Sequence, residues 1–137
     1  MSPCVVDASI FGPLFFDDEK DSIFDGLGAL LAEGECLAPQ HWRLELVNQI
    51  INGHRRKRMT AEMADAAIAL IAGLEVAIDE ETWRHHAETF ALATKHGLTA
   101  YDAAYLELAL RRRATLASYD GDLRKAARLE SLEIQPQ

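Results

Sequence analysis

The feature of this sequence that most constrains its fold is a regular alternation of short β-rich runs with longer segments of helical periodicity. The first run, Cys4-Val5-Val6, stops at Asp7, and the second, Cys36-Leu37-Ala38, is stopped by Pro39. Further runs lie at 75–78 and 115–117, and 133–134 is a candidate edge strand. Runs this short between helices are typical of buried strands in βαβ units. We therefore expect an α/β fold, a parallel β-sheet flanked by helices on both faces.

The helical segments between these runs carry apolar residues at intervals of three and four. The expected helices span about 18–33, 40–55 and 80–96, another begins at Thr60, a fifth runs from Thr99 to about Arg112, and the last opens at Asp122. In the helix at 40–55, Leu46, Val47, Ile50 and Ile51 are expected to share the buried face. No repeat or linker interrupts the pattern, so residues 1–137 are expected to form a single domain.

Composition and local sequence indicate where such a chain would reside. No apolar run reaches the roughly 18 residues that span a bilayer, and the first residues lack the basic start of a signal peptide. Cys4 and Cys36 lie in apolar stretches without metal-ligand spacing, which favours buried free thiols in a reducing compartment. We expect a cytoplasmic protein that is not bound to a membrane.

Charge is unevenly distributed along the chain. The formal net charge of −8 argues against a protein that coats nucleic acid by bulk attraction, but not against an enzyme that gathers carboxylates around cations. Half of the 14 Lys and Arg residues lie in two short runs, 55–58 and 111–113. These runs could bind nucleic-acid phosphates, or they could simply complement helix C-termini, where cations are stabilising.

Five acids stand where a parallel sheet would bring them together. The carboxyl ends of the strands form one edge of such a sheet, and functional sites lie beyond that edge. One acid follows the first strand, one lies in the first turns of the helix after the second strand, one lies in the first turn of the helix near 100, and two follow the strand at 115–117: Asp7, Glu45, Asp102, Asp120 and Asp122.

Each acid also has a structural explanation of its own. Asp7 could be a turn residue, Glu45 could belong to a solvated helix face with His41 and Asn48, and Asp120-Gly121-Asp122 could be a turn with a helix cap. Asp102 fits a capping box that Thr99 opens, yet it also lies on the apolar stripe of its helix with Tyr105 and Leu106. A carboxylate that points inward is costly unless it is paired or bound to a cation.

Taken together, the acids indicate a metal site. Clustered carboxylates repel one another, and no softer ligand accompanies them, because the histidines lack zinc spacing and no cysteine is near. Ligation by oxygen alone favours Mg²⁺ or Mn²⁺. Such ions in a carboxylate pocket typically activate water for attack on a phosphodiester.

Four segments of the chain resemble those of one known family. Val5-Val6-Asp7-Ala8-Ser9 is similar to the opening strand of PIN-domain nucleases, and Trp42 to Asn48 resembles the helix with their second acid. Leu98 to Tyr105 is similar to the segment with the third acid, and Leu116 to Leu123 to the segment with the fourth. The order and spacing cover nearly the whole chain, and its length suits the VapC toxins of VapBC toxin–antitoxin pairs.

The resemblance implies a metal-dependent endoribonuclease that acts as the toxin of a type II toxin–antitoxin system. By analogy, Asp7, Glu45, Asp102 and Asp120 are expected to be the catalytic and metal-holding residues, with Asp122 as a further candidate ligand. Ser9 and Ser118 match small hydroxyl residues of the family. The family also implies a homodimer, an RNA substrate and a cognate antitoxin that covers the site. Trp42, Trp83 and Tyr101 could stack RNA bases, or they could serve core and interface packing.

Two other functions remain open on the sequence alone. A phosphatase could use Asp7 as its nucleophile, although the haloacid-dehalogenase pattern would place a second acid where Ser9 stands. A non-catalytic RNA- or protein-binding module would use the acids only as caps and surface charge.

Overall fold

A five-stranded parallel sheet organises the computed structural model, which describes residues 3–22 and 26–137. The strands are β1 (Cys4–Val6), β2 (Cys36–Pro39), β3 (Ala77–Asp79), β4 (Thr115–Ala117) and β5 (Ile134–Gln135), in the order β3-β2-β1-β4-β5. Every pairing is parallel, with Cys4 opposite both Cys36 and Thr115. The predicted parallel sheet is confirmed, and its carboxyl ends share one edge.

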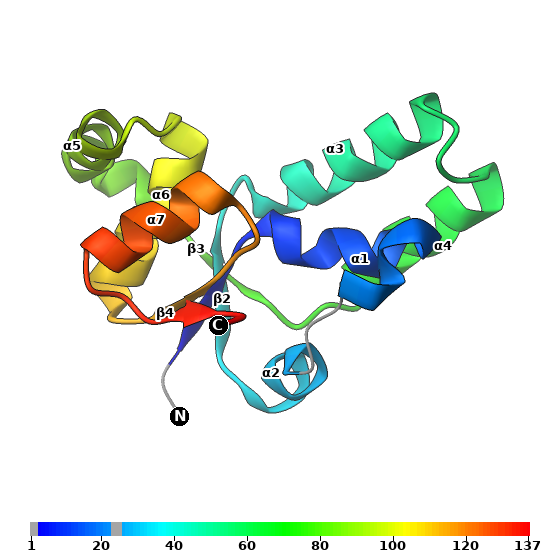
Figure 1. The fold of residues 1–137 in the computed structure, drawn as a ribbon, viewed down its shortest axis with the longest axis horizontal. Coiled ribbons are helices and arrows are strands. Elements are labelled where there is room, and N and C mark those ends of the chain that lie inside the picture. The colour runs from blue at the N-terminus through cyan, green and yellow to red at the C-terminus, as the bar shows by residue number, and fades with distance from the viewer. Residues whose placement is uncertain (1–2, 23–25) are drawn as a thin grey trace.

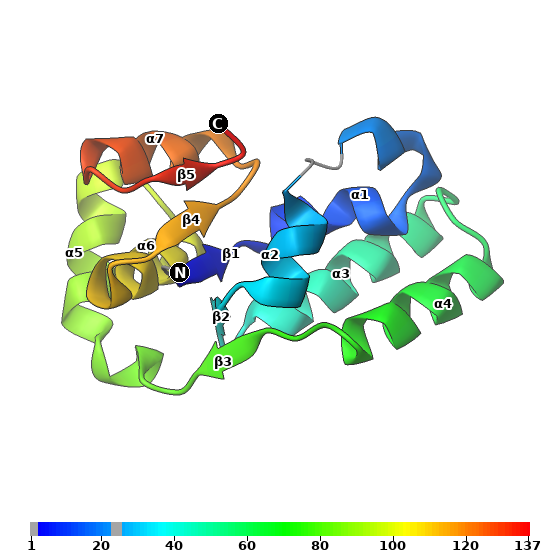
Figure 2. The same cartoon turned by 90° about the horizontal axis from the view of Figure 1, so that it is seen from below.

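Helices flank the sheet on both sides. On one side α6 (Ala100–Arg112) packs against β1, β2 and β4, and it is covered in turn by α5 (His86–His96) and α7 (Gly121–Leu129). The short helix α2 (Leu27–Glu33) lies on the other side of the strands (Figures 1 and 2). The helices α1 (Gly12–Phe15), α3 (Trp42–Arg55) and α4 (Ala61–Ala72) extend away from the carboxyl edge as a separate group (Figure 1). The sheet edge therefore faces the space between α6 and α3.

The central strand lies in the hydrophobic core. All three residues of β1 are buried, as are the four residues of β2. This continuous burial explains why the strands read as uninterrupted apolar runs rather than alternating ones. The largest fully buried side chains come from several segments: Trp42, Tyr105, Phe11, Ile10, Leu27 and Leu46.

Several expected boundaries need correction. The single helix expected at 18–33 is wrong: a 3₁₀ helix spans Asp17–Ser22, α2 begins only at Leu27, and residues 23–25 lie outside the described part. Upstream of it, a 3₁₀ helix (Ala8–Phe11) leads into α1, where the sequence had no expected helix. The helix expected at 80–96 is a 3₁₀ turn, Thr82–Arg84, followed by α5. In the added segment that precedes them, Phe11 and Phe15 are buried in the core.

The starts of two helices follow the expected capping chemistry. The Thr99 hydroxyl accepts a hydrogen bond from the backbone N–H of Asp102, as predicted, and Thr60 caps α4 in the same way. The last helix does not open at Asp122, because Asp120 is its N-cap and the helix begins at Gly121.

The buried face of α3 is narrower than expected. Leu46 and Ile50 are buried, but Val47 is half-buried and Ile51 is 37% exposed. Near the C-terminal end of the same buried face, Gly53 allows the ring of Phe16 to approach so closely that a Cβ would lie 2.3 Å from it. The last turns of α3 therefore pack closely against the end of α1.

Both thiols are free and buried, as predicted. Burial raises the pKa of the Cys4 thiol to about 12, which leaves it unreactive. Within residues 3–22 and 26–137, no helix combines the length and apolar character needed to cross a membrane.

Candidate active site at the carboxyl edge of the sheet

Asp7 follows β1 directly and lies at the centre of the candidate site. Its side chain is buried, and its Oδ2 accepts hydrogen bonds from the hydroxyls of Ser9 and Ser118, each over 2.7 Å. Burial raises the pKa of the Asp7 carboxyl; the two hydroxyls oppose the rise, while the charges of Glu45 and Asp120 add to it. The carboxylate is therefore held in one orientation, and no ion pair with a described residue compensates its charge.

Two serines tie the end of β1 to the end of β4. The backbone N–H of Tyr119 donates to Ser9 Oγ over 2.8 Å, and that of Asp120 donates to Ser118 Oγ over 3.0 Å. Ser118 is fully buried. These contacts fix the positions of Asp7 and of the segment that carries Asp120 relative to each other.

Glu45 reaches the same edge from the first turns of α3. Its Oε1 accepts a hydrogen bond from the Tyr105 hydroxyl on α6, and His41 Nε2 lies 3.4 Å from it. Burial raises the pKa of the Glu45 carboxyl, and the charge of Asp102 raises it further. The expected solvated face is thus only partly correct, since Asn48 is exposed but His41 and Glu45 are half-buried.

Asp102 and Asp120 complete the group from the starts of α6 and α7. Burial raises the pKa of the half-buried Asp102 to about 6, with further contributions from the charges of Asp120, Asp7 and, more weakly, Asp122. The Oδ1 of Asp120 accepts a hydrogen bond from the N–H of Leu123 over 2.9 Å, so its second oxygen is not used by this cap. Asp122 is exposed and lies at the margin of the group.

The acids are brought into electrostatic contact but are not neutralised. Among the residues that the structure describes, Asp7, Asp102 and Asp120 form no ion pair, and Glu45 has only His41. The nearby guanidinium of Arg124 donates instead to the carbonyl oxygens of Ser118 and Pro136. An uncompensated set of hard oxygen donors is the chemistry that Mg²⁺ and Mn²⁺ prefer. In residues 3–22 and 26–137, however, no three His, Cys, Asp or Glu side chains are grouped closely enough to hold an ion as they stand.

The structure adds two residues that the sequence analysis did not assign to the site. Tyr105 was placed on the apolar stripe of α6, where its hydroxyl in fact reaches Glu45. His41 was assigned to a solvated face, although its ring packs against Tyr105 at 5.1 Å between centroids. The available signal was the spacing along each helix. Tyr105 lies three residues after Asp102, and His41 lies four residues before Glu45.

Three of the seven basic residues in the two runs pair with carboxylates outside the candidate site. Arg111 binds both Asp79 and Glu107, Arg112 pairs with Glu35, and Arg58 pairs with Asp18 and Glu19. The run at 111–113 is therefore largely structural. In the other run, Arg55, Arg56 and Lys57 are exposed at the tip between α3 and α4.

The aromatic candidates for base stacking differ sharply in exposure. Trp42 is fully buried against Phe11, so it cannot stack a base from solution. Trp83 is 56% exposed and packs under the guanidinium of Arg84. Tyr101, beside Asp102, is 64% exposed.

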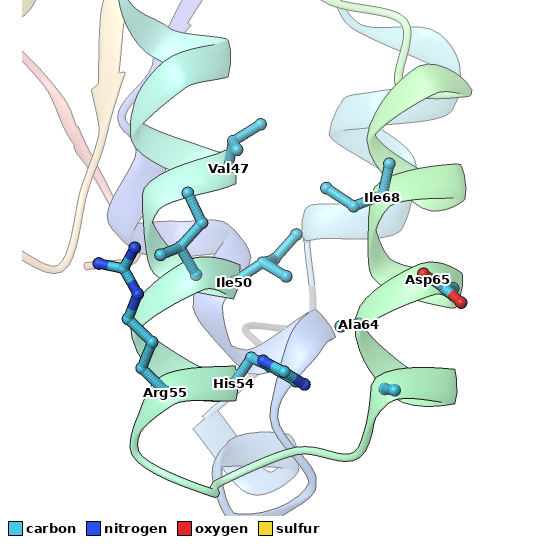
Figure 3. A pocket seen from close by; sticks show the side chains of 9 residues that line it. Val47, Ile50, His54, Arg55, Ala64, Asp65 and Ile68 are labelled. Carbon is cyan, nitrogen blue, oxygen red and sulfur yellow. The ribbon is translucent and has the colours of Figure 1, made fainter.

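Two hollows run along the exposed side of α3. The one in Figure 3 lies between α3 and α4, and His54 and Ile68 point into it from opposite helices. Its volume is about 480 Å³, and none of the five candidate acids lines it. A second hollow of about 440 Å³ lies nearer the first turn of α3 and includes Glu45 and Tyr101 in its lining. The two hollows share Val47 and Ile51 in their linings, so they are neighbours along the helix.

Comparison with protein families gives one match, to the model described as PIN domain, over residues 4–129. This range covers all seven α-helices and the first four strands. No curated protein sequence matches the chain.

Solved structures share the fold at low sequence identity. The Pyrobaculum aerophilum protein PAE2754 superposes with a TM-score of 0.66 at 21% identity, covering 91% of this chain and 84% of that one. VapBC2 from Rickettsia felis, bound to a DNA fragment from its promoter, gives 0.66 at 15% identity and covers 97% of both chains. Mycobacterium tuberculosis VapC20, a toxin that cleaves the sarcin-ricin loop, gives 0.58 at 18% identity, covering 90% of this chain and 94% of that one.

Proposed function

Because this chain belongs to the PIN-domain family, we propose that it is a metal-dependent endoribonuclease and the toxin component of a type II toxin–antitoxin system. One observation carries the proposal. Carboxylates from four separate segments, Asp7, Glu45, Asp102 and Asp120, meet at the carboxyl edge of the sheet, and the pKa of each of the first three is raised. A protein would gain nothing in stability from such an arrangement, since each unpaired carboxylate costs free energy.

A divalent cation would remove that cost. Asp7, Glu45, Asp102 and Asp120 would hold Mg²⁺ or Mn²⁺, directly or through water, with Asp122 as an outer candidate. When bound, the ion would lower the pKa of water and neutralise charge on a phosphodiester. The carboxylates would have to draw together around it, which half-buried Glu45 and Asp102 have room to do.

The protein side chains have distinct tasks in this proposal. Ser9 and Ser118 fix the buried carboxylate of Asp7, so that it presents one oxygen to the site. Tyr105 orients Glu45 through its hydroxyl. The N-terminal ends of α6 and α7 also face the edge, and their dipoles favour the negative charge of these acids and of a bound phosphate.

Structural relatives support a partner for the site. The Rickettsia felis relative is a VapBC2 complex. By analogy, we infer that this chain binds an antitoxin that covers the acids with a cationic side chain, and that the toxin forms a homodimer. An antitoxin that binds this way would compensate the same negative charge as the metal.

The first test is RNA cleavage by the purified protein with magnesium or manganese and with excess EDTA. Asp7→Asn and Asp120→Asn should each lower the cleavage rate by roughly a thousandfold or more, because several kcal/mol of transition-state stabilisation depend on the metal. Asn is also a good N-cap, so Asp120→Asn should keep α7 folded, which circular dichroism can check. Full activity in EDTA would contradict the proposal.

The same assay separates the alternatives. Hydrolysis of an unactivated phosphate monoester, lost in Asp7→Asn, would favour a phosphatase. RNA binding without cleavage under any metal would favour a binding module.

The partner is tested by co-expression. A small DNA-binding protein encoded next to this chain should co-purify with it and block RNA cleavage. Failure of every neighbouring open reading frame to give a stable complex would remove the toxin assignment, while leaving the nuclease proposal intact.

A further inference from the structure

A hollow beside the acids has no task in the chemistry described so far. It lies between the first turns of α3 and the start of α6, and its lining is mostly apolar: His41, Leu44, Glu45, Val47, Asn48, Ile51 and Tyr101. Leu44 is 72% exposed and Tyr101 is 64% exposed. Large apolar side chains so exposed next to a polar site are commonly binding surfaces.

Tyr101 is exposed, but its position is defined. His41 Nε2 lies 3.1 Å from the carbonyl oxygen of Tyr101, and the two rings meet edge to face at 5.5 Å between centroids. Thr99 caps the same helix two residues earlier. The aromatic ring therefore stands on a fixed backbone, and little conformational entropy would be lost when a ligand packs on it.

The charges around the hollow limit what it can bind. Its lining contains one carboxylate, Glu45, and no lysine or arginine, so an anionic phosphate would be repelled there. A neutral, planar group with polar edges suits the combination of Tyr101, Leu44 and the exposed amide of Asn48. Nucleobases have this chemistry, and every base offers a face for aromatic stacking.

The hollow lies next to the acids at which the phosphodiester would be cleaved. Glu45 lines the hollow and belongs to the acidic group, and Tyr101 immediately precedes Asp102. We propose that this hollow binds the nucleobase next to the scissile phosphate, with Tyr101 as the stacking surface and Asn48 at the base edge. The inference rests on the proposed ribonuclease function and adds to it a substrate class: unpaired RNA, whose bases are free to leave a helical stack.

A protein segment is the competing occupant of an apolar hollow. The base is favoured because the hollow shares Glu45 with the acids. The groove between α3 and α4 (Figure 3), which none of the five acids lines, offers a protein partner a surface of its own.

The test uses single-stranded oligoribonucleotides in which one base at a time is removed. The variants are Tyr101→Ala, Tyr101→Trp and the control Phe90→Ala, since Phe90 is 71% exposed on α5 and does not line the hollow. For the unaltered protein, loss of one base beside the cleavage position should lower kcat/KM by roughly five- to 150-fold, the range for one stacked base. Tyr101→Ala should show a similar loss on intact RNA and no further loss at that abasic position. Tyr101→Trp should remain sensitive to that abasic position, because Trp still offers a stacking face, and only Phe90→Ala should behave like the unaltered protein.

Equal sensitivity of Tyr101→Ala and the unaltered protein to every abasic position would overturn the inference, even if RNA is cleaved. If Tyr101→Ala instead loses a co-expressed partner protein and keeps its RNA profile, the hollow belongs to that partner and the inference is also wrong.

A second readout separates this inference from the proposed function. Binding of an oligoribonucleotide that carries 2-aminopurine can be followed with calcium in place of magnesium, without cleavage. Quenching of the fluorescent base by the unaltered protein but not by Tyr101→Ala would support the stacking site even if no RNA is cut. Absence of quenching at every position would overturn it.

Discussion

Two groups of acids in this molecule have opposite electrostatic surroundings. At the end of β3, Asp79 and Glu107 share the guanidinium of Arg111, which makes paired hydrogen bonds of 2.8–3.0 Å to both carboxylates. At the ends of β1 and β4, Asp7 and Asp120 meet Glu45 and Asp102 with no Lys or Arg partner among the described residues. Both groups sit on the same sheet, so topology alone does not distinguish them.

The pKa of the Asp79 carboxyl shifts in the opposite direction to the shifted pKa values of the other group. Burial alone would raise the pKa of Asp79, but its hydrogen bonds and charge interaction with Arg111 outweigh burial and lower it. In the other group burial and like charges act together, and the pKa values of Asp7, Glu45 and Asp102 all rise. The first group is therefore a structural tie between β3 and α6, whereas the second has no Lys or Arg counter-charge among the described residues.

The strongest test of this contrast removes the shared cation. Arg111→Met should destabilise the fold by about 3–5 kcal/mol, because it leaves two buried carboxylates without their shared cation. The side chains of Asp79 and Glu107 are only 7% and 4% exposed. Chemical denaturation of the variant measures the loss, and the double variant Arg111→Met/Glu107→Gln should recover part of it. A loss below about 1 kcal/mol would mean that the two groups differ less than their contacts indicate.

The second test neutralises a carboxylate in the unpaired group. In EDTA at pH 7, Asp102→Asn should melt no lower than the unaltered protein and be up to about 1 kcal/mol more stable, since Asp102 is half-exposed and its repulsion is screened by solvent. With millimolar magnesium the unaltered protein should gain stability and the variant much less, because an ion that binds only the folded state stabilises it. The variant should also cleave RNA orders of magnitude more slowly. A variant that melts lower in EDTA, responds normally to magnesium and still cleaves RNA would show that Asp102 is only a capping residue.

The stability difference between Asp102→Asn and the unaltered protein in EDTA should change with pH in a defined direction. The pKa of the Asp102 carboxyl is raised from 3.8 to about 6 in the folded protein. Where the carboxyl is protonated in both the folded and the unfolded protein, it does not lower the free energy of unfolding. Its full destabilising effect is reached once the carboxyl is ionised in both. The advantage of Asp102→Asn in EDTA should therefore be absent below about pH 4, grow between pH 4 and 6, and stay constant above. Asp79 has the opposite sign: its stabilisation is present above pH 3.8 and is lost as pH falls through its lowered folded value.

The smallest effect is expected at the neighbouring arginine. Arg112 pairs with Glu35 at the surface, with side chains 41% and 54% exposed, so Arg112→Met should change stability by less than about 1 kcal/mol. Thermal melts of Arg111→Met and Arg112→Met side by side provide a matched pair. Equal losses would show that chain position, rather than the buried carboxylates, sets the cost.

The sequence by itself determined the parallel sheet, and it predicted which acids lie at its carboxyl edge. Alternating apolar runs and helical segments specify parallel strands, and the rule that sites lie beyond their carboxyl ends points to Asp7 and Asp120. Local capping chemistry also determined where α4 and α6 begin, because a Thr side chain and the N–H three residues later are close in any such helix.

Only the tertiary structure decided which charges remain free. The sequence analysis treated residues 111–113 as one basic run and assigned no role to Asp79, because nothing local joins Arg111 to a residue 32 positions away. It likewise treated Tyr105 as a core residue, although its hydroxyl meets Glu45 across 60 positions. Short-range patterns specify secondary structure because their interactions are local. The pairing of charges depends on contacts between distant segments, and these arise only when the sheet and its helices are packed together.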